Sequence, residues 1–173
     1  MTSLLTQVKL YTVSILSMFL FQTCAYIDMD VPAHKLVVEY GSDDLIPIFH
    51  KHVERFIAEA DKRNYTFRNK RVKIQWDSGL AAYIHGQSNV MRDIKINPAS
   101  NKLGIEHMEC QLIVHELFHS LCQDFRGDVH DEKEFIEGTF YFTSLMVASS
   151  TRYNFPTLDQ KELWDQYFDT LFR

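Results

Sequence analysis

Two histidines four residues apart, with a glutamate directly after the first, occur in the segment IVHELFHSL, residues 113–121. In a helix, His115 and His119 would lie one above the other on the same face, where both imidazoles can bind one metal ion at about 2.0–2.1 Å. Glu116 would be rotated by about 100° from His115, so it is better placed to reach a water at the ion than to bind the ion itself. The spacing therefore predicts two zinc ligands and one general base.

The alternative for this segment is a core helix in which the two histidines bond backbone carbonyls and the glutamate pairs with a lysine. Glu116 is the only formal charge between Gln111 and Cys122. A carboxylate in an apolar helix is costly unless it has a partner, and a zinc ion would supply one. This context favours the metal site.

A second motif lies downstream, and the two together resemble a known family. VHELFHSL (114–121) followed by FIEGTF (135–140) is similar to zincin metallopeptidases of the glutamate-ligand type, the gluzincins. The resemblance implies that Glu137, which precedes Gly138, is the third zinc ligand on the next helix. It also implies a zinc-dependent peptidase (cofactor Zn²⁺) that acts on peptide or protein substrates.

Other side chains compete for the third ligand position. His130 stands 11 residues after His119, a spacing found in other zincin branches, and Glu134 lies one helical turn before Glu137. The metzincin branch is excluded because the residue six after His119 is Phe125. The remaining acidic candidates are Asp128 and Asp131.

The resemblance to gluzincins fails at one position. Many gluzincins carry an aspartate four residues after the ligand glutamate, which accepts a hydrogen bond from a ligand histidine, and here that position is Tyr141. A backbone carbonyl would then have to orient the histidine. The group that stabilises the oxyanion is also left open, with three candidates: His130, Tyr141 and Tyr153.

The elements that must position these residues form one α+β domain. The pattern predicts strands over 34–40, 71–76, 79–85 and 90–97, a turn at 86–89, and helices over 42–64, 105–122, 131–149 and 156–172. The first two strands and the helix between them predict a right-handed βαβ unit. The resemblance implies a zincin-like core: a small mixed sheet with a backing helix, an active-site helix and C-terminal helices. The strand at 90–97 is expected at its edge.

The N-terminus predicts export. An uncharged, mostly apolar run of 12 residues, 10–21, follows Lys9; it is too short for a membrane span and typical of a secretory signal. Residues 1–25 are therefore expected to be a signal peptide, cleaved after Ala25 or replaced by a lipid anchor at Cys24. The mature domain, 26–173, is expected outside the cytosol: secreted, periplasmic or anchored at the envelope.

The net charge and the cysteine positions limit the possible partners and disulfides. The formal net charge is −5, without a basic run, which argues against nucleic acid as a partner. Cys110 and Cys122 lie too far apart on one helix to form a disulfide.

The first hypothesis for the function is a secreted or envelope-anchored peptidase in which a metal-activated water attacks the peptide bond, with Glu116 as general base. The rival is a zincin-fold binding module without peptidase activity; the short chain favours it, and the presence of Glu116 argues against it.

Overall fold

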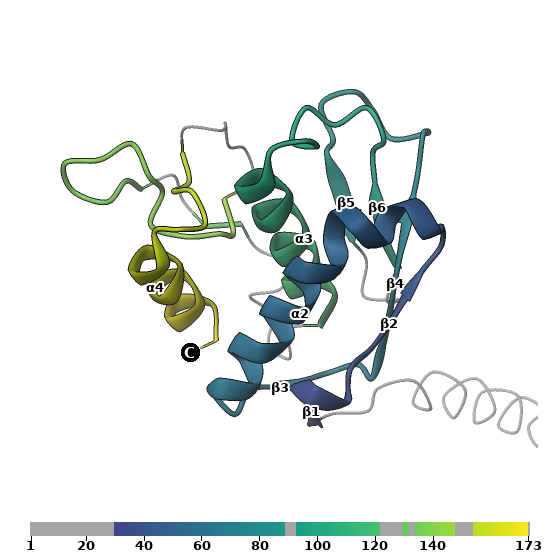
Figure 1. Ribbon diagram of the computed structural model, residues 1–173, viewed down its shortest axis with the longest axis horizontal. Helices are drawn as coiled ribbons and strands as arrows, with labels where there is room; N and C mark the ends of the chain where they lie inside the picture. Colours follow the sequence, from purple (N-terminus) through teal and green to yellow (C-terminus); the bar gives the residue numbers. More distant parts are fainter. Residues whose placement is uncertain (1–29, 89–92, 122–129, 132–133, 148–153, 173) are drawn as a thin grey trace, which may run out of the picture.

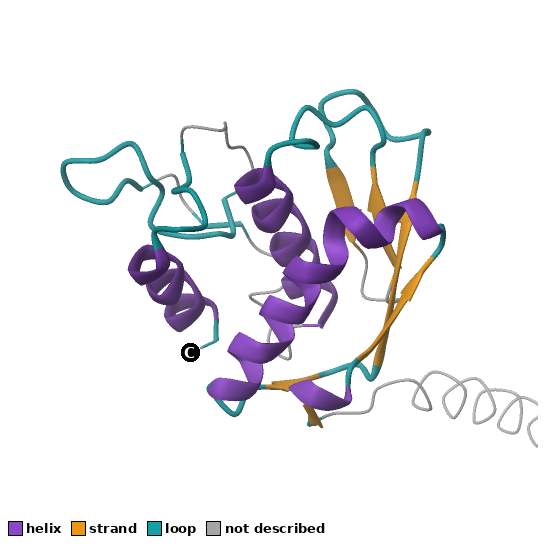
Figure 2. Cartoon of the chain, viewed as in Figure 1, coloured by secondary structure: helices purple, strands orange, loops and turns teal. Residues whose placement is uncertain are grey.

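The computed structural model describes residues 30–88, 93–121, 130–131, 134–147 and 154–172 (Figure 1). The expected signal, the candidates Cys24, Asp128 and Tyr153, and the residues Cys122 and Phe125 lie outside the described residues. The described chain is mixed α/β, with three α-helices and two small sheets. In Figure 2, α2 and α3 lie next to the larger sheet, and α4 lies beyond α3.

The larger sheet has the strand order β2–β4–β6–β5. Its strands are β2 (Val37–Tyr40), β4 (Arg71–Trp76), β6 (Asp93–Ile96) and β5 (Gly86–Ser88). β2, β4 and β6 are parallel, and β5 pairs antiparallel with β6. The smaller sheet pairs β1 (Val31–Pro32) with β3 (Thr66–Phe67).

This topology confirms the parallel pairing predicted for the first βαβ unit, and it corrects two strand predictions. The edge strand is β5; β6, which falls within the expected edge strand 90–97, is interior. Residues 79–85 form turns rather than a strand, because buried Asn97 holds them in a loop. Its side-chain amide donates to the carbonyl oxygens of Ala81 and Ile84 at 3.3 and 3.0 Å.

Two helices build the core against the sheet. α2 (Ile46–Lys62) buries one face through Phe49, Val53 and Phe56, which recur at helical spacing. α3 (Glu106–Leu121) is buried along nearly its whole length between α2 and the sheet. α4 (Lys161–Leu171) begins later than predicted. Among the described residues, no helix combines the length and apolar character that crossing a bilayer requires.

The predicted helix over 131–149 is wrong in the residues that the structure describes. Residues 134–147 form turns and isolated bridges, which pair Phe135 with Phe142 and Asp131 with Val147. Gly138 turns the chain with a φ of +73°, a conformation that suits glycine and ends a helix. Two apolar residues at the start of this segment are exposed, Phe135 at 50% and Phe140 at 80%, although the Phe135 ring stacks on Phe142 with centroids 4.8 Å apart.

Candidate metal centre

α3 brings the first two histidines together as its spacing requires. His115 and His119 lie one turn apart on this helix, and their Nε2 atoms are 3.1 Å apart. His115 is buried, whereas His119 is partly exposed. This geometry confirms the prediction that His115 and His119 share one face of the helix.

His130 approaches the same point from the chain beyond α3. Its Nε2 lies 3.2 Å from Nε2 of His115 and 3.3 Å from Nε2 of His119. The three residues are the one group of possible metal ligands found among the described residues. A tetrahedral ion with bonds of about 2.0–2.1 Å holds its ligands about 3.3–3.4 Å apart, so the triangle of nitrogens fits such an ion with little adjustment.

A backbone carbonyl orients the buried histidine. His115 Nδ1 donates to the Leu145 carbonyl oxygen at 2.9 Å, which leaves the lone pair of Nε2 free for a metal. The side-chain amide of Gln111 donates to the same oxygen at 3.2 Å, and the Lys102 ammonium donates to Gln111 Oε1 at 2.7 Å. The backbone carbonyl that was expected to orient a histidine, in place of a side chain at Tyr141, is therefore that of Leu145.

The electrostatics keep the imidazoles of His115 and His130 neutral, which is the form that binds a metal. Burial, with a smaller contribution from His119, lowers the pKa of His115 to about 3, although the bond to Leu145 opposes the shift. Burial and His119 also lower the pKa of His130, while Asp131 opposes the shift. Protons therefore compete little with a metal at these two ligands near pH 7.

Glu116 is a buried carboxylate beside the histidines. Burial raises its pKa to about 7, although Ser88 of β5 and the Lys102 ammonium both lower it. The edge strand covers it closely, because a Cβ added at Gly86 would lie 2.8 Å from Glu116 Oε1. Only glycine leaves this space to the carboxylate, so β5 and Glu116 fix each other's position.

The site opens into a pocket of about 240 Å³. His115, Glu116 and His130 line it together with the turn residues Tyr83 and His85. A catalytic zinc site keeps an open fourth position for water or substrate, and this pocket supplies the space for it.

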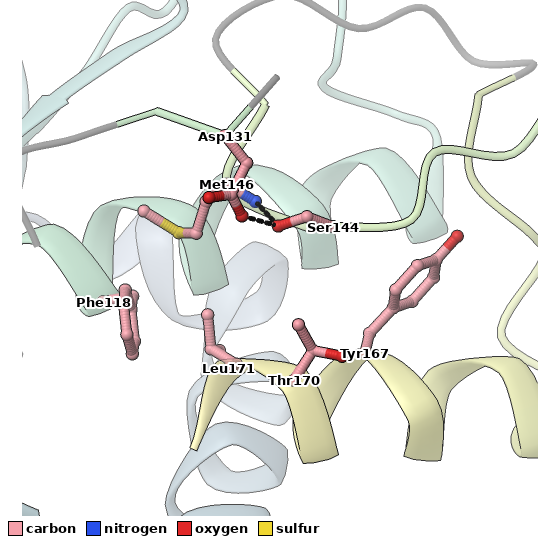
Figure 3. A pocket seen from close by; sticks show the side chains of 7 residues that line it. All are labelled: Phe118, Asp131, Ser144, Met146, Tyr167, Thr170 and Leu171. Atoms are coloured by element: carbon pink, nitrogen blue, oxygen red, sulfur yellow. Dashed lines mark hydrogen bonds between the residues drawn. The ribbon is translucent and has the colours of Figure 1, made fainter. Parts of the chain in front are cut away.

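A polar contact fixes the chain next to His130. In Figure 3 the Ser144 hydroxyl lies between the Asp131 carboxylate, to which it donates, and the backbone N–H of Met146, from which it accepts at 3.0 Å. This contact borders a second, smaller pocket of about 120 Å³ between α3 and α4, which Phe118 and Leu171 also line. Because Asp131 follows His130 directly, the contact restrains the third imidazole.

The other predicted residues lie elsewhere. Glu137 is exposed on the turn with Gly138, and neither it nor exposed Glu134 belongs to the histidine group. Asp131 is exposed and bonded by Ser144, as described above. The Tyr141 hydroxyl donates to Gln160 Oε1 at 3.3 Å.

The sequence prediction missed several residues of the site, among them His85, Gly86, Lys102 and Gln111. Gln111 could have been found, because it stands one helical turn before His115 on the same face. No spacing rule connects the other three to α3.

Comparison with known proteins gives no relative. No family model matches the chain, and no curated protein and no solved structure is significantly similar to it.

Proposed function

We propose that the protein is a zinc-dependent peptidase whose metal is held by His115, His119 and His130. The observation that carries the proposal is the convergence of three Nε2 atoms beside a buried glutamate, at the base of an open pocket. Three histidines with one open position are the donor set of a catalytic zinc site. A bound Zn²⁺ would lower the pKa of water to about 7 and polarise the scissile carbonyl.

The protein's own residues would divide the remaining work. Glu116 takes the proton of the attacking water and passes it to the leaving amine, a role suited to a carboxylate with a pKa of about 7. The Leu145 carbonyl holds the His115 tautomer. A peptide would add to the free edge of β5, which lies directly over Glu116.

The proposal moves the third ligand from Glu137 to His130. The support is geometric, since His130 Nε2 lies within 3.3 Å of both other imidazole nitrogens and Glu137 is exposed on a turn. We retain a zincin-like core in the proposal. Its support is the parallel sheet with an antiparallel edge strand beside the helix that carries HELFH.

We also propose that the domain works outside the cytosol, because residues 1–25 have the pattern of a secretory signal. Mass spectrometry of protein made in a secreting host should find an N-terminus at Tyr26, or a lipid-modified Cys24. An intact Met1 in the cytosolic fraction would contradict export.

The test of the peptidase combines zinc content with hydrolysis of an unfolded protein such as casein. Wild-type protein should bind about one zinc per chain and cleave casein. Glu116→Gln should keep the zinc and lose hydrolysis by about 10²–10⁴-fold or more, because it removes a general base and not a ligand. Loss of zinc from Glu116→Gln would overturn its assigned role.

The ligand assignment needs a separate pair of variants. His130→Ala should lower zinc affinity by more than the roughly 10–100-fold that outer-shell changes cause, while Glu137→Ala should leave it unchanged. The reverse result would restore the glutamate as ligand. A wild-type protein that binds zinc but cleaves nothing would instead favour a zinc-stabilised binding module.

A further inference from the structure

The wall of the pocket carries a buried positive charge that the proposed reaction does not use. Lys102 stands in the turn before α3, is 7% exposed and lines the pocket with Glu116 and His115. Burial lowers the pKa of its ammonium to about 8, and the Glu116 carboxylate opposes this shift. The side chain therefore remains mostly charged at pH 7 and puts a cation in the wall of the pocket, where it also donates to Gln111 Oε1 at 2.7 Å.

His85 adds a hydrogen-bond donor to the same pocket. The Ser100 hydroxyl oxygen accepts from the backbone N–H of Lys102 at 3.2 Å and lies 3.1 Å from His85 Nδ1. The hydroxyl can then donate its own hydrogen to Nδ1, which places the ring proton on Nε2. Burial and Lys102 lower the pKa of His85, so this imidazole is a neutral donor at pH 7.

The shape of the pocket limits what these groups could bind. Its volume of about 240 Å³ is below the roughly 300–1,000 Å³ of ordinary ligand sites, so it suits one side chain or a chain end. Asn97 fixes the turn that carries His85, and its backbone N–H donates to the His85 carbonyl at 3.0 Å. Among the described residues that line the pocket, Glu116 is the one acid. In the proposed reaction Glu116 serves as base, and the Lys102 ammonium, which also donates to Gln111 Oε1, is the cation that a substrate carboxylate would meet in this pocket.

We propose that Lys102 and His85 form a subsite for a carboxylate of the substrate, next to the peptide bond that is cleaved. The proposal rests on the proposed peptidase function and names its substrate class. The carboxylate belongs either to an acidic side chain or to the C-terminus of the peptide. A charge-assisted hydrogen bond from a buried ammonium selects for the charged ligand by about 10–100-fold.

The experiment uses three fluorogenic peptides that differ only in where a carboxylate stands. The first has a glutamate beside the scissile bond and an amidated end, the second has glutamine there and an amidated end, and the third has glutamine and a free C-terminus. Zinc-loaded wild type should cleave the first or the third with a kcat/KM about 10–100 times that for the second. Preference for the first peptide identifies an acidic side chain, and preference for the third identifies a chain end.

The variants test whether Lys102 causes the preference. Lys102→Met should bring the ratio of kcat/KM values close to one, and His85→Phe should reduce it by a smaller factor. Lys51→Met is the matched control, because Lys51 pairs with Glu106 on the surface and does not line the pocket. It should leave both the activity and the ratio unchanged. A carboxylate that merely binds the metal would keep its preference in Lys102→Met, and that result would overturn the subsite.

Binding without hydrolysis separates the two proposals. Calorimetry on zinc-loaded Glu116→Gln should give the same order of peptide affinities, which Lys102→Met in that background should abolish. If wild type cleaves nothing but this order of affinities holds, the subsite stands and the peptidase fails. If wild type cleaves all three peptides equally, the peptidase stands and the subsite fails, whether or not Lys102→Met folds.

Discussion

Two regions that meet at the three histidines differ in how much regular secondary structure they contain. The larger sheet with α2 and α3 is built on apolar burial: Phe49, Phe56, Ile74 and Ile94 are fully buried within it. The 134–147 segment has no regular helix, and its turn is stabilised by backbone and hydroxyl hydrogen bonds. Its apolar side chains are divided between core and surface, since Leu145 is buried and Phe140 is 80% exposed.

The two regions hold different parts of the metal site. The apolar framework fixes His115 and His119, because both stand on buried α3. The other region supplies the Leu145 carbonyl that orients His115, and its bridge from Val147 to Asp131 positions the residue next to His130. A metal bound by all three histidines would therefore join a rigid region to a more weakly held one.

The largest expected effect comes from the framework. Phe56 is fully buried on α2 and stacks on Phe67, with ring centroids 5.5 Å apart. Phe56→Ala should lower the free energy of unfolding by about 3–5 kcal/mol, since it removes a large side chain and leaves a cavity. Urea denaturation measures this, with Phe140→Ala as a control that should change stability by less than about 0.5 kcal/mol. Equal effects of the two variants would contradict the difference between the regions.

A buried histidine in the framework predicts the next largest effect. His52 on α2 is 2% exposed, and its Nε2 has no hydrogen-bond partner within the described structure. Burial lowers its pKa from 6.5 to about 4. Between these values the unfolded chain binds a proton that the folded chain does not, so stability rises with pH through this window.

The measurement is the unfolding free energy of metal-free protein between pH 4 and 7. At about 1.4 kcal/mol per pKa unit, His52 should account for a loss of about 3 kcal/mol on going from pH 7 to 4. His52→Met should remove that share, so the difference between variant and wild type should change with pH by this amount. A constant difference would show that His52 does not titrate as expected.

Removing the metal should affect mainly the weaker region. A ligand at 100 times its Kd stabilises the state that binds it by about 2.7 kcal/mol. Chelation should therefore speed amide hydrogen exchange across 134–147, while the amides of α2 keep their protection. Hydrogen exchange with and without a chelator measures this, and uniform loss of protection in both regions would contradict it.

The same difference explains how far the sequence could predict the molecule. α2 and α3 follow from local periodicity, because a helix that buries one face repeats its apolar residues in the sequence. The pair His115 and His119 is equally local. No local sequence pattern describes how the chain brings His130 back to the other two histidines. From the sequence alone, His130 was therefore one of several candidates for the third ligand.

The errors have physical causes at particular residues. The pattern over 131–149 predicts a helix, but Gly138 at φ +73° turns the chain and leaves Phe140 exposed. GQS, at the start of the turn predicted at 86–89, is the edge strand β5, because it pairs with β6 and its glycine makes room for Glu116. Both depend on contacts with residues distant in sequence, which composition does not reveal.

The smallest effect tests the contact that holds the third ligand. Ser144 connects the Asp131 carboxylate to the backbone of Met146, so Ser144→Ala frees the residue next to His130 without touching a ligand (Figure 3). Zinc affinity should fall by about tenfold, the lower end of the range for outer-shell changes, and unfolding stability by about 1 kcal/mol. Thr143→Ala is the control, since the exposed Thr143 hydroxyl makes a long contact to the Glu134 carbonyl, at 3.5 Å, and the backbone hydrogen bond to the same oxygen stays in the variant. A competition titration with a chromogenic chelator measures both variants. Leu145, whose carbonyl oxygen orients His115, lies between Ser144 and Met146, so a selective loss in Ser144→Ala shows that this segment supports the metal site, and comparison with His130→Ala tells how much of the loss acts through His130. Unchanged zinc affinity in Ser144→Ala would contradict a role of this contact in holding His130.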